Sequence, residues 1–110
     1  MNPNERKAAA RAYKEQATVG GLYRIHNTKT GWKSAILATP NMQGQRNKLA
    51  FSKKTNAVFD PSFQAQWTQY GADAFELEEL ELLKQKPDQS TKEFREDLAA
   101  LLELWEQKNE

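Results

Sequence analysis

The sequence predicts an α+β domain in which a three-stranded antiparallel sheet is flanked by helices. Two short apolar stretches on either side of a turn-forming run predict a hairpin, and a later stretch in which Leu and Glu alternate predicts a third strand. Apolar residues at helical spacing precede and follow that third stretch. The predicted order is helix, strand, strand, helix, helix, strand, helix.

Length and composition narrow the class of protein. The chain has 110 residues, enough for one domain with a modest core, and its lack of cysteine excludes a disulfide framework and a thiolate metal site. The first residues carry charge of both signs and no apolar run, and no later stretch is long and apolar enough to span a membrane. We therefore expect a soluble cytoplasmic protein without a membrane partner.

Charge is distributed unevenly along the chain. Residues 16–59 contain seven Lys or Arg and no acid, whereas residues 60–110 contain thirteen acids and five bases. A basic block of this kind indicates a face that meets a polyanion such as DNA or RNA. The same pattern also arises when the two blocks pair with each other or are simply solvated. Both interpretations remain open at this point.

The N-terminal segment, residues 4–17, consists mostly of good helix formers and predicts a helix with a thin apolar face. The glycine pair at 20–21 ends it. We therefore divide the chain into an N-terminal helical extension, residues 1–19, and a main domain, residues 20–110.

The hairpin is expected from two strands, residues 22–26 and 32–39, joined by a turn over residues 27–31. In the second strand the run AILA, residues 35–38, lacks clean alternation. An uninterrupted apolar run predicts a central strand that is covered on both sides.

The first helix of the main domain begins after Pro40, with Asn41 as a suitable N-cap. It is expected to direct Met42, Leu49 and Ala50 inward and to end before a loop over residues 52–59.

A second helix begins at Asp60-Pro61, a cap residue followed by a first-turn proline. Phe63, Trp67 and Tyr70 recur at i, i+4 and i+7 along it. Such a stripe can stack on nucleic-acid bases, but this spacing is far more often the core face of a helix, and we favour the core.

Residues 74–83 are ambiguous by pattern alone. Their Leu and Glu content favours a helix. Phe75 and Leu77, followed after a phase slip by Leu80 and Leu82, favour a strand with a β-bulge.

The last helix begins at a capping box formed by Ser90 and Glu93. It carries the clearest amphipathic pattern in the chain and must lie on the sheet. Its apolar stripe consists of Phe94, Leu98, Leu101, Leu102 and Trp105.

Two blocks of sequence resemble the GIY-YIG nuclease superfamily. Gly21-Leu22-Tyr23, a second strand ending at Pro40-Asn41, and the helix that follows resemble the N-terminal half of these enzymes. Residues 63–78, FQAQWTQYGADAFELE, resemble the block of small bacterial members in which a helix leads into the third strand. The resemblance covers roughly residues 20–106, and it implies that residues 74–83 form a strand.

The resemblance also implies a chemistry, the cleavage of a phosphodiester bond. Tyrosines of the superfamily help to activate a water molecule, and an arginine on the next helix stabilises the charge that develops on the phosphate. A glutamate on a later helix holds one divalent metal ion such as Mg²⁺.

Only the first of these positions keeps its residue type. Tyr23 matches the tyrosine of the first motif, but Ala35 stands at the second tyrosine, Gln45 at the arginine and Leu102 at the metal-binding glutamate. Alanine cannot move a proton, and leucine cannot bind a metal ion.

Neighbouring residues do not restore the pattern. Arg46 follows Gln45 but points about 100° away on a helix, and Glu96 and Glu103 lie near Leu102 but out of register. We interpret Tyr23 and Arg46 as vestigial catalytic residues and expect no cofactor and no metal site.

Three functions follow from these observations. The first, which we favour, is a catalytically degenerate GIY-YIG-like domain that binds nucleic acid. The second is a protein-interaction module that uses the acidic second half of the chain. The third is an active Mg²⁺-dependent DNA endonuclease in which Arg46 and either Glu96 or Glu103 take the lost roles. The residues expected to contact nucleic acid are Arg24, Lys29, Trp32, Lys33, Arg46, Lys48, Lys53 and Lys54.

Overall fold

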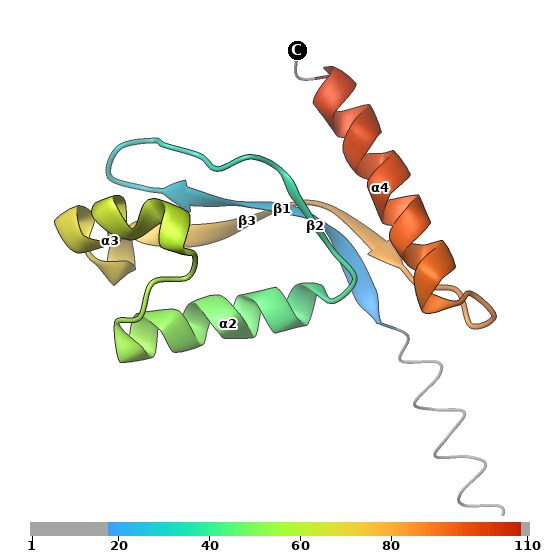
Figure 1. Cartoon of the computed structure of the whole chain (residues 1–110), viewed down its shortest axis with the longest axis horizontal. Coiled ribbons are helices and arrows are strands. Elements are labelled where there is room, and N and C mark those ends of the chain that lie inside the picture. The colour runs from blue at the N-terminus through green and yellow to red at the C-terminus, as the bar shows by residue number, and fades with distance from the viewer. Residues whose placement is uncertain (1–17, 109–110) are drawn as a thin grey trace, which may run out of the picture.

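The computed structural model describes residues 18–108 and consists of one antiparallel sheet with helices packed against it (Figure 1). The strands lie in the order β2-β1-β3. The predicted α+β class is confirmed, and the helix predicted over residues 4–17 lies outside the described residues. In chain order the elements are β1 (Val19–Asn27), β2 (Leu37–Thr39), α2 (Met42–Thr55), the 3₁₀ turn η1 (Pro61–Phe63), α3 (Gln64–Tyr70), the 3₁₀ turn η2 (Ala72–Ala74), β3 (Phe75–Lys84) and α4 (Thr91–Lys108).

The ambiguous segment is the strand β3, although its composition favours a helix. It pairs with β1 along the full length of both strands. Leu22 lies opposite Glu81 and Tyr23 opposite Glu79, so Leu80 is the extra residue of a β-bulge. The bulge that the phase slip predicts is therefore present.

The second strand is shorter than predicted and lies elsewhere in the sheet. The strand expected over residues 32–39 reduces to the three residues of β2, which form an edge, while β1 takes the centre. The prediction of a covered central strand is wrong, and Leu37 is 38% exposed. One cause is local: the hydroxyl of Ser34 accepts the N–H of Ile25 at 2.9 Å, so a side chain replaces part of the backbone ladder.

Helix α2 begins where the sequence predicts and ends later. The side chain of Asn41 accepts the N–H of Gly44 at 3.0 Å, which confirms the N-cap. The helix runs through residues 52–55, which were expected to be a loop, because no Gly or Pro interrupts it there. It ends at Asn56, whose φ of 57° is the left-handed conformation common at helix C-termini.

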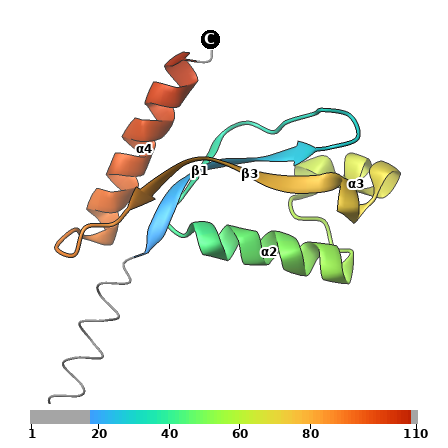
Figure 2. The same cartoon turned by 180° about the vertical axis from the view of Figure 1, so that it is seen from behind.

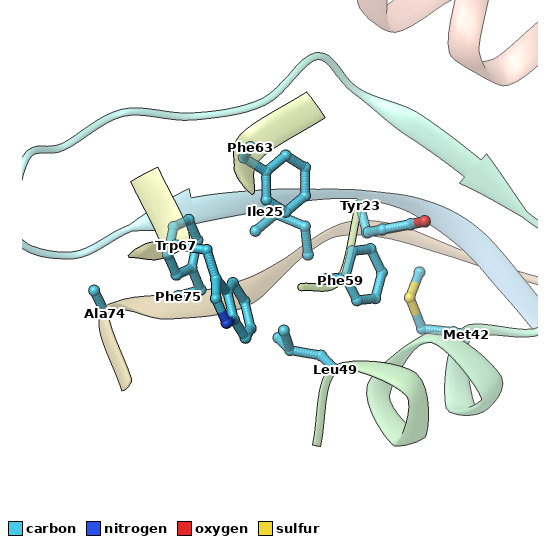
Figure 3. Close-up of a cluster of buried hydrophobic side chains, with 9 residues drawn as sticks. All are labelled: Tyr23, Ile25, Met42, Leu49, Phe59, Phe63, Trp67, Ala74 and Phe75. Atoms are coloured by element: carbon cyan, nitrogen blue, oxygen red, sulfur yellow. The ribbon is translucent and has the colours of Figure 1, made fainter. Parts of the chain in front are cut away.

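The main core lies between one face of the sheet and the segments α2 and α3 (Figure 3). The predicted aromatic stripe belongs to it: Trp67 stacks on Phe75 with ring centroids 4.9 Å apart, and Phe63 stacks on the same ring at 5.9 Å. Ala50, expected to point inward, is exposed. The buried members of this core are Tyr23, Ile25, Met42, Leu49, Phe59, Phe63, Trp67, Ala74 and Phe75.

Helix α4 packs on the opposite face of the sheet, as its amphipathic pattern predicts. Phe94 and Leu98 are buried there, and the end of the Phe94 ring would lie 3.0 Å from a Cβ added at Gly20. The capping box is formed, because the N–H of Glu93 donates to the Ser90 hydroxyl at 3.1 Å. Both views place α4 at the end of the sheet away from α3 (Figures 1 and 2).

The glycine pair in β1 allows the close approach of the neighbouring strands. Gly21 has φ +153°, and a Cβ there would lie 2.1 Å from the carbonyl oxygen of Glu81. Gly21→Ala should therefore destabilise the domain by about 3 kcal/mol or more in urea denaturation. Gly31→Ala, at φ +79° with open space around it, is the matched control and should cost about 1 kcal/mol. Equal losses in the two variants would contradict the steric argument.

Candidate functional site

The tyrosine of the first motif lies in the core with its hydroxyl at the side of α2. Tyr23 is 6% exposed and occupies the middle of β1. Its hydroxyl donates a hydrogen bond to Oε1 of Gln45 at 3.3 Å, across 22 positions of sequence. The structure thus brings together two residues that the resemblance assigns to one catalytic centre.

The Gln45 side chain contacts Tyr23 on one side and Thr39 on the other. It lies one turn into α2, after the Asn41 cap, and its Nε2 lies 3.5 Å from the hydroxyl of Thr39, a long contact. The Thr39 hydroxyl is buried at the end of β2 and also accepts the N–H of Asn41 at 3.1 Å. We call Tyr23, Gln45 and Thr39 the Tyr23 cluster.

The Tyr23 cluster holds no charge. Burial, with a smaller effect from the negative charge of Asp60, raises the pKa of the Tyr23 phenol above its ordinary value. The phenol therefore stays protonated at neutral pH, as an ordinary tyrosine also does. Gln45 presents an amide where a cation would be needed to stabilise phosphoryl charge.

The other family positions lie apart from this cluster. Ala35 is exposed in the connection between β1 and β2, and Leu102 is half-buried on α4. Glu96 and Glu103 are exposed on α4. Among residues 18–108 no three His, Cys, Asp or Glu side chains gather closely enough to hold a metal ion. The position that the resemblance assigns to the single metal-binding glutamate carries Leu102, which has no oxygen or nitrogen in its side chain to offer a cation.

Arg46 does not replace the missing arginine at Tyr23. Its guanidinium forms an ion pair with Glu79 of β3 and donates to Oε1 of Gln43 at 2.8 Å. The carboxylate of Glu79 raises the pKa of the Arg46 guanidinium further above its ordinary value. Arg46 therefore ties α2 to β3.

Several other predicted nucleic-acid contacts are engaged within the domain. Arg24 pairs with Glu78 at 2.8 and 3.1 Å, and Lys33 lies 3.9 Å from the same carboxylate. The bidentate bond from Arg24 lowers the pKa of Glu78. Lys29 donates to the carbonyl of Tyr70 at 3.0 Å.

Trp32, the predicted stacking residue, is half-buried against the core. Its ring lies 5.6 Å from that of Phe63, with the planes tilted by 55°. One side of the indole is thus already covered by protein.

Helix α2 holds the remaining predicted cations. Lys48 lies 4.5 Å above the ring of Phe59, and Lys53 and Lys54 occupy the last turn. The helix contains four basic residues and no Asp or Glu over its 14 residues. It is therefore the most basic in composition of the described helices.

Sequence analysis missed one residue of this helix. Phe51 is 65% exposed, more than any other large apolar side chain among residues 18–108. Phe51 directly precedes the loop predicted over residues 52–59, and a single Phe at the end of a predicted helix is often taken for a core residue. The signal was present in its neighbours, since the helical spacing surrounds it with polar residues.

Comparison with known proteins adds no relative: no family description, curated protein or solved structure matches this chain. The described helices include none that has both the length and the apolar character needed to cross a membrane.

The burial of Tyr23 has a measurable consequence. In an absorbance titration, the difference between wild type and Tyr23→Phe should have its midpoint above the usual tyrosine pKa of about 10. Because folding raises this pKa, the stability that the neutral phenol contributes is complete below pH 10 and declines as pH rises through the folded value. A midpoint at or below the usual value, with the variant still folded by circular dichroism, would contradict the buried placement.

Proposed function

We propose that this protein is a non-catalytic domain of the GIY-YIG type that binds the phosphate backbone of nucleic acid through α2. The observation that carries the binding role is the helix itself, which presents four basic residues and no acid. Phosphate contacts by Lys and Arg supply most of the affinity of non-specific nucleic-acid binding.

The Tyr23 cluster supports the non-catalytic part of the proposal. The hydrogen bond from Tyr23 to Gln45 agrees with the register in which Gln45 takes the place of the catalytic arginine. A neutral amide at this position does not offer the cation that phosphodiester cleavage requires.

The remaining basic residues lie on two different surfaces of the domain. Arg24 and Lys33 share the carboxylate of Glu78, on the sheet face opposite to α2. On α2, Lys48, Lys53 and Lys54 have no salt bridge among residues 18–108. Lys54 is exposed, whereas Lys48 lies over the Phe59 ring and Lys53 is half-buried in a pocket shared with Glu79. The proposed phosphate contacts therefore come from three lysines spread around α2, with Lys54 on its outer side.

The first test concerns cleavage. Supercoiled and branched DNA incubated with the protein and Mg²⁺ or Mn²⁺ should remain intact, because the domain lacks the groups that activate water and hold the metal ion. Gel electrophoresis beside an EDTA control measures this. Metal-dependent nicking that is lost in Tyr23→Phe would show that the protein is an active nuclease.

The second test concerns binding. With about three phosphate contacts, affinity for a labelled oligonucleotide in fluorescence anisotropy should fall roughly 20-fold between about 50 and 200 mM salt. Charge reversal of Lys53 and Lys54 together should weaken binding by about tenfold or more and flatten this dependence. Binding that ignores salt, or none at low salt, would refute the proposal. A protein partner that binds regardless of these charges would favour an interaction module.

Two glutamates provide matched controls for the position of the surface. Glu79→Gln releases Arg46 beside α2 and should strengthen binding several-fold, because it restores a cation to the helix. Glu78→Gln makes the same change in net charge on the opposite face, beside Arg24, and should have a smaller effect. Equal effects would indicate net charge alone, without a defined surface.

A further inference from the structure

Phe51 is an aromatic side chain in a basic setting. It lies on α2, it is 65% exposed, and it belongs to no core cluster. Burial of a Phe side chain is worth about 1.5–3 kcal/mol, so this ring contributes little to folding where it stands. We infer that Phe51 stacks on an unpaired base and that α2 therefore binds single-stranded nucleic acid in preference to duplex. This inference rests on the proposed function.

The helical spacing surrounds the ring with groups that suit a nucleic-acid backbone. On an α-helix the surface neighbours of a residue lie three and four positions away. For Phe51 these are Lys48 and Lys54 at three positions, and Asn47 and Thr55 at four. Of these, the Lys48 ammonium lies 4.5 Å from the Phe59 ring centroid, and the Thr55 hydroxyl donates to the Phe51 carbonyl at 2.9 Å. Lys54 and Asn47 are therefore the groups directed to the solvent beside the ring. A base on the ring would place a flanking phosphate near Lys54.

The ridge continues toward the start of α2. Gln43, Asn47 and Phe51 recur at intervals of four and share the outer face of the helix. The side chains of Gln43 and Asn47 hydrogen-bond to each other at 2.9 Å, and both are exposed. They extend the polar track on which a strand can lie beyond the stacked base.

The other exposed apolar side chains lack these features. Val19, Leu37, Leu82 and Leu104 are aliphatic and lie on β1, β2, β3 and α4. An aliphatic side chain cannot offer the flat face that a base requires. Among the large apolar residues that the structure leaves exposed, Phe51 alone is aromatic and alone lies on an acid-free helix.

The state of the bases decides which form of nucleic acid this surface prefers. Bases inside a duplex stack on their neighbours and leave no face for a side chain, whereas unpaired bases do. One stacked base on an aromatic ring is worth about 5- to 100-fold in affinity. Duplex DNA would keep the phosphate contacts of α2 without this increment.

The test compares strands by fluorescence anisotropy at low salt. The probes are oligo(dT) and oligo(U) of about 12 nucleotides and a duplex of the same length. The wild type should bind at least one single strand about 5- to 100-fold more tightly than duplex. Phe51→Ala and Phe51→Leu should lose this preference while keeping duplex affinity, and Phe51→Tyr should retain it, because it keeps an aromatic face.

Two controls separate stacking from structure. Leu104→Ala removes an apolar side chain that is 54% exposed on α4 and should leave all affinities unchanged. Thermal denaturation should show that Phe51→Ala unfolds no earlier than the wild type, since Ala has the higher helix propensity and no packing is lost. A marked loss of stability, or a change of oligomeric state in size-exclusion chromatography, would assign Phe51 to an interface and overturn the inference.

The outcomes also distinguish a failure of the inference about Phe51 from a failure of the proposed function. Equal affinity for single strands and duplex, unaffected at Phe51, would overturn stacking and leave backbone binding by α2 intact. A preference that survives in Phe51→Leu would also overturn it. No binding to any probe at low salt would refute the proposed function itself.

Discussion

The β-bulge in β3 allows one strand to make a polar contact with each of the two helical layers. In a regular strand Glu79 and Glu81 would point to the same face. The extra residue, Leu80, sends them to opposite faces, so that Glu79 lies opposite Tyr23 and Glu81 opposite Leu22. Each glutamate then meets a helix. The first pairs with Arg46 of α2, and the second accepts the indole N–H of Trp105 of α4 at 3.2 Å.

The same strand also governs the charge of the surface. The sequence left open whether the basic block faces a polyanion or pairs with the acidic block, and the structure shows the second arrangement for three of the seven basic residues. Glu78 engages Arg24 and Lys33, and Glu79 engages Arg46. Internal pairing thereby engages cations near the sheet, and among the described residues Lys48, Lys53 and Lys54 of α2 form no salt bridge.

Local patterns predicted those parts of the fold that depend on neighbours in sequence. The Asn41 cap, the capping box at Ser90 and the aromatic core face were read correctly, because short-range spacing determines them. The order of strands in the sheet depends on long-range pairing. An apolar run such as residues 35–38 carries no information about whether its neighbours lie on one side or two, so β2 was misplaced.

The candidate site likewise has parts that the sequence could predict and parts that it could not. The resemblance implies that Tyr23 and Gln45 lie near each other, and in the structure they are hydrogen-bonded across a distance in sequence that no periodicity could predict. Their membership of a former catalytic centre stays a prediction. The sequence could not predict the ion-pair partners of the basic residues, because these partners depend on which face of β3 each glutamate occupies after the bulge. Phe51 was not singled out, because its exposure depends on which side of α2 faces the sheet, although its polar neighbours at helical spacing gave a signal.

Binding and cleavage place different demands on a protein, and the proposed function attributes to this domain the groups for only one of them. Affinity for a phosphate backbone needs cations at tolerant spacing, which α2 supplies. Cleavage needs a base and a cation positioned for charge that appears only in the transition state. A substitution such as arginine to glutamine at position 45 removes the second without disturbing the first. Gln45 accepts a hydrogen bond from Tyr23, which joins β1 to α2, so glutamine at this position is compatible with the packing that holds the lysines of α2 in place.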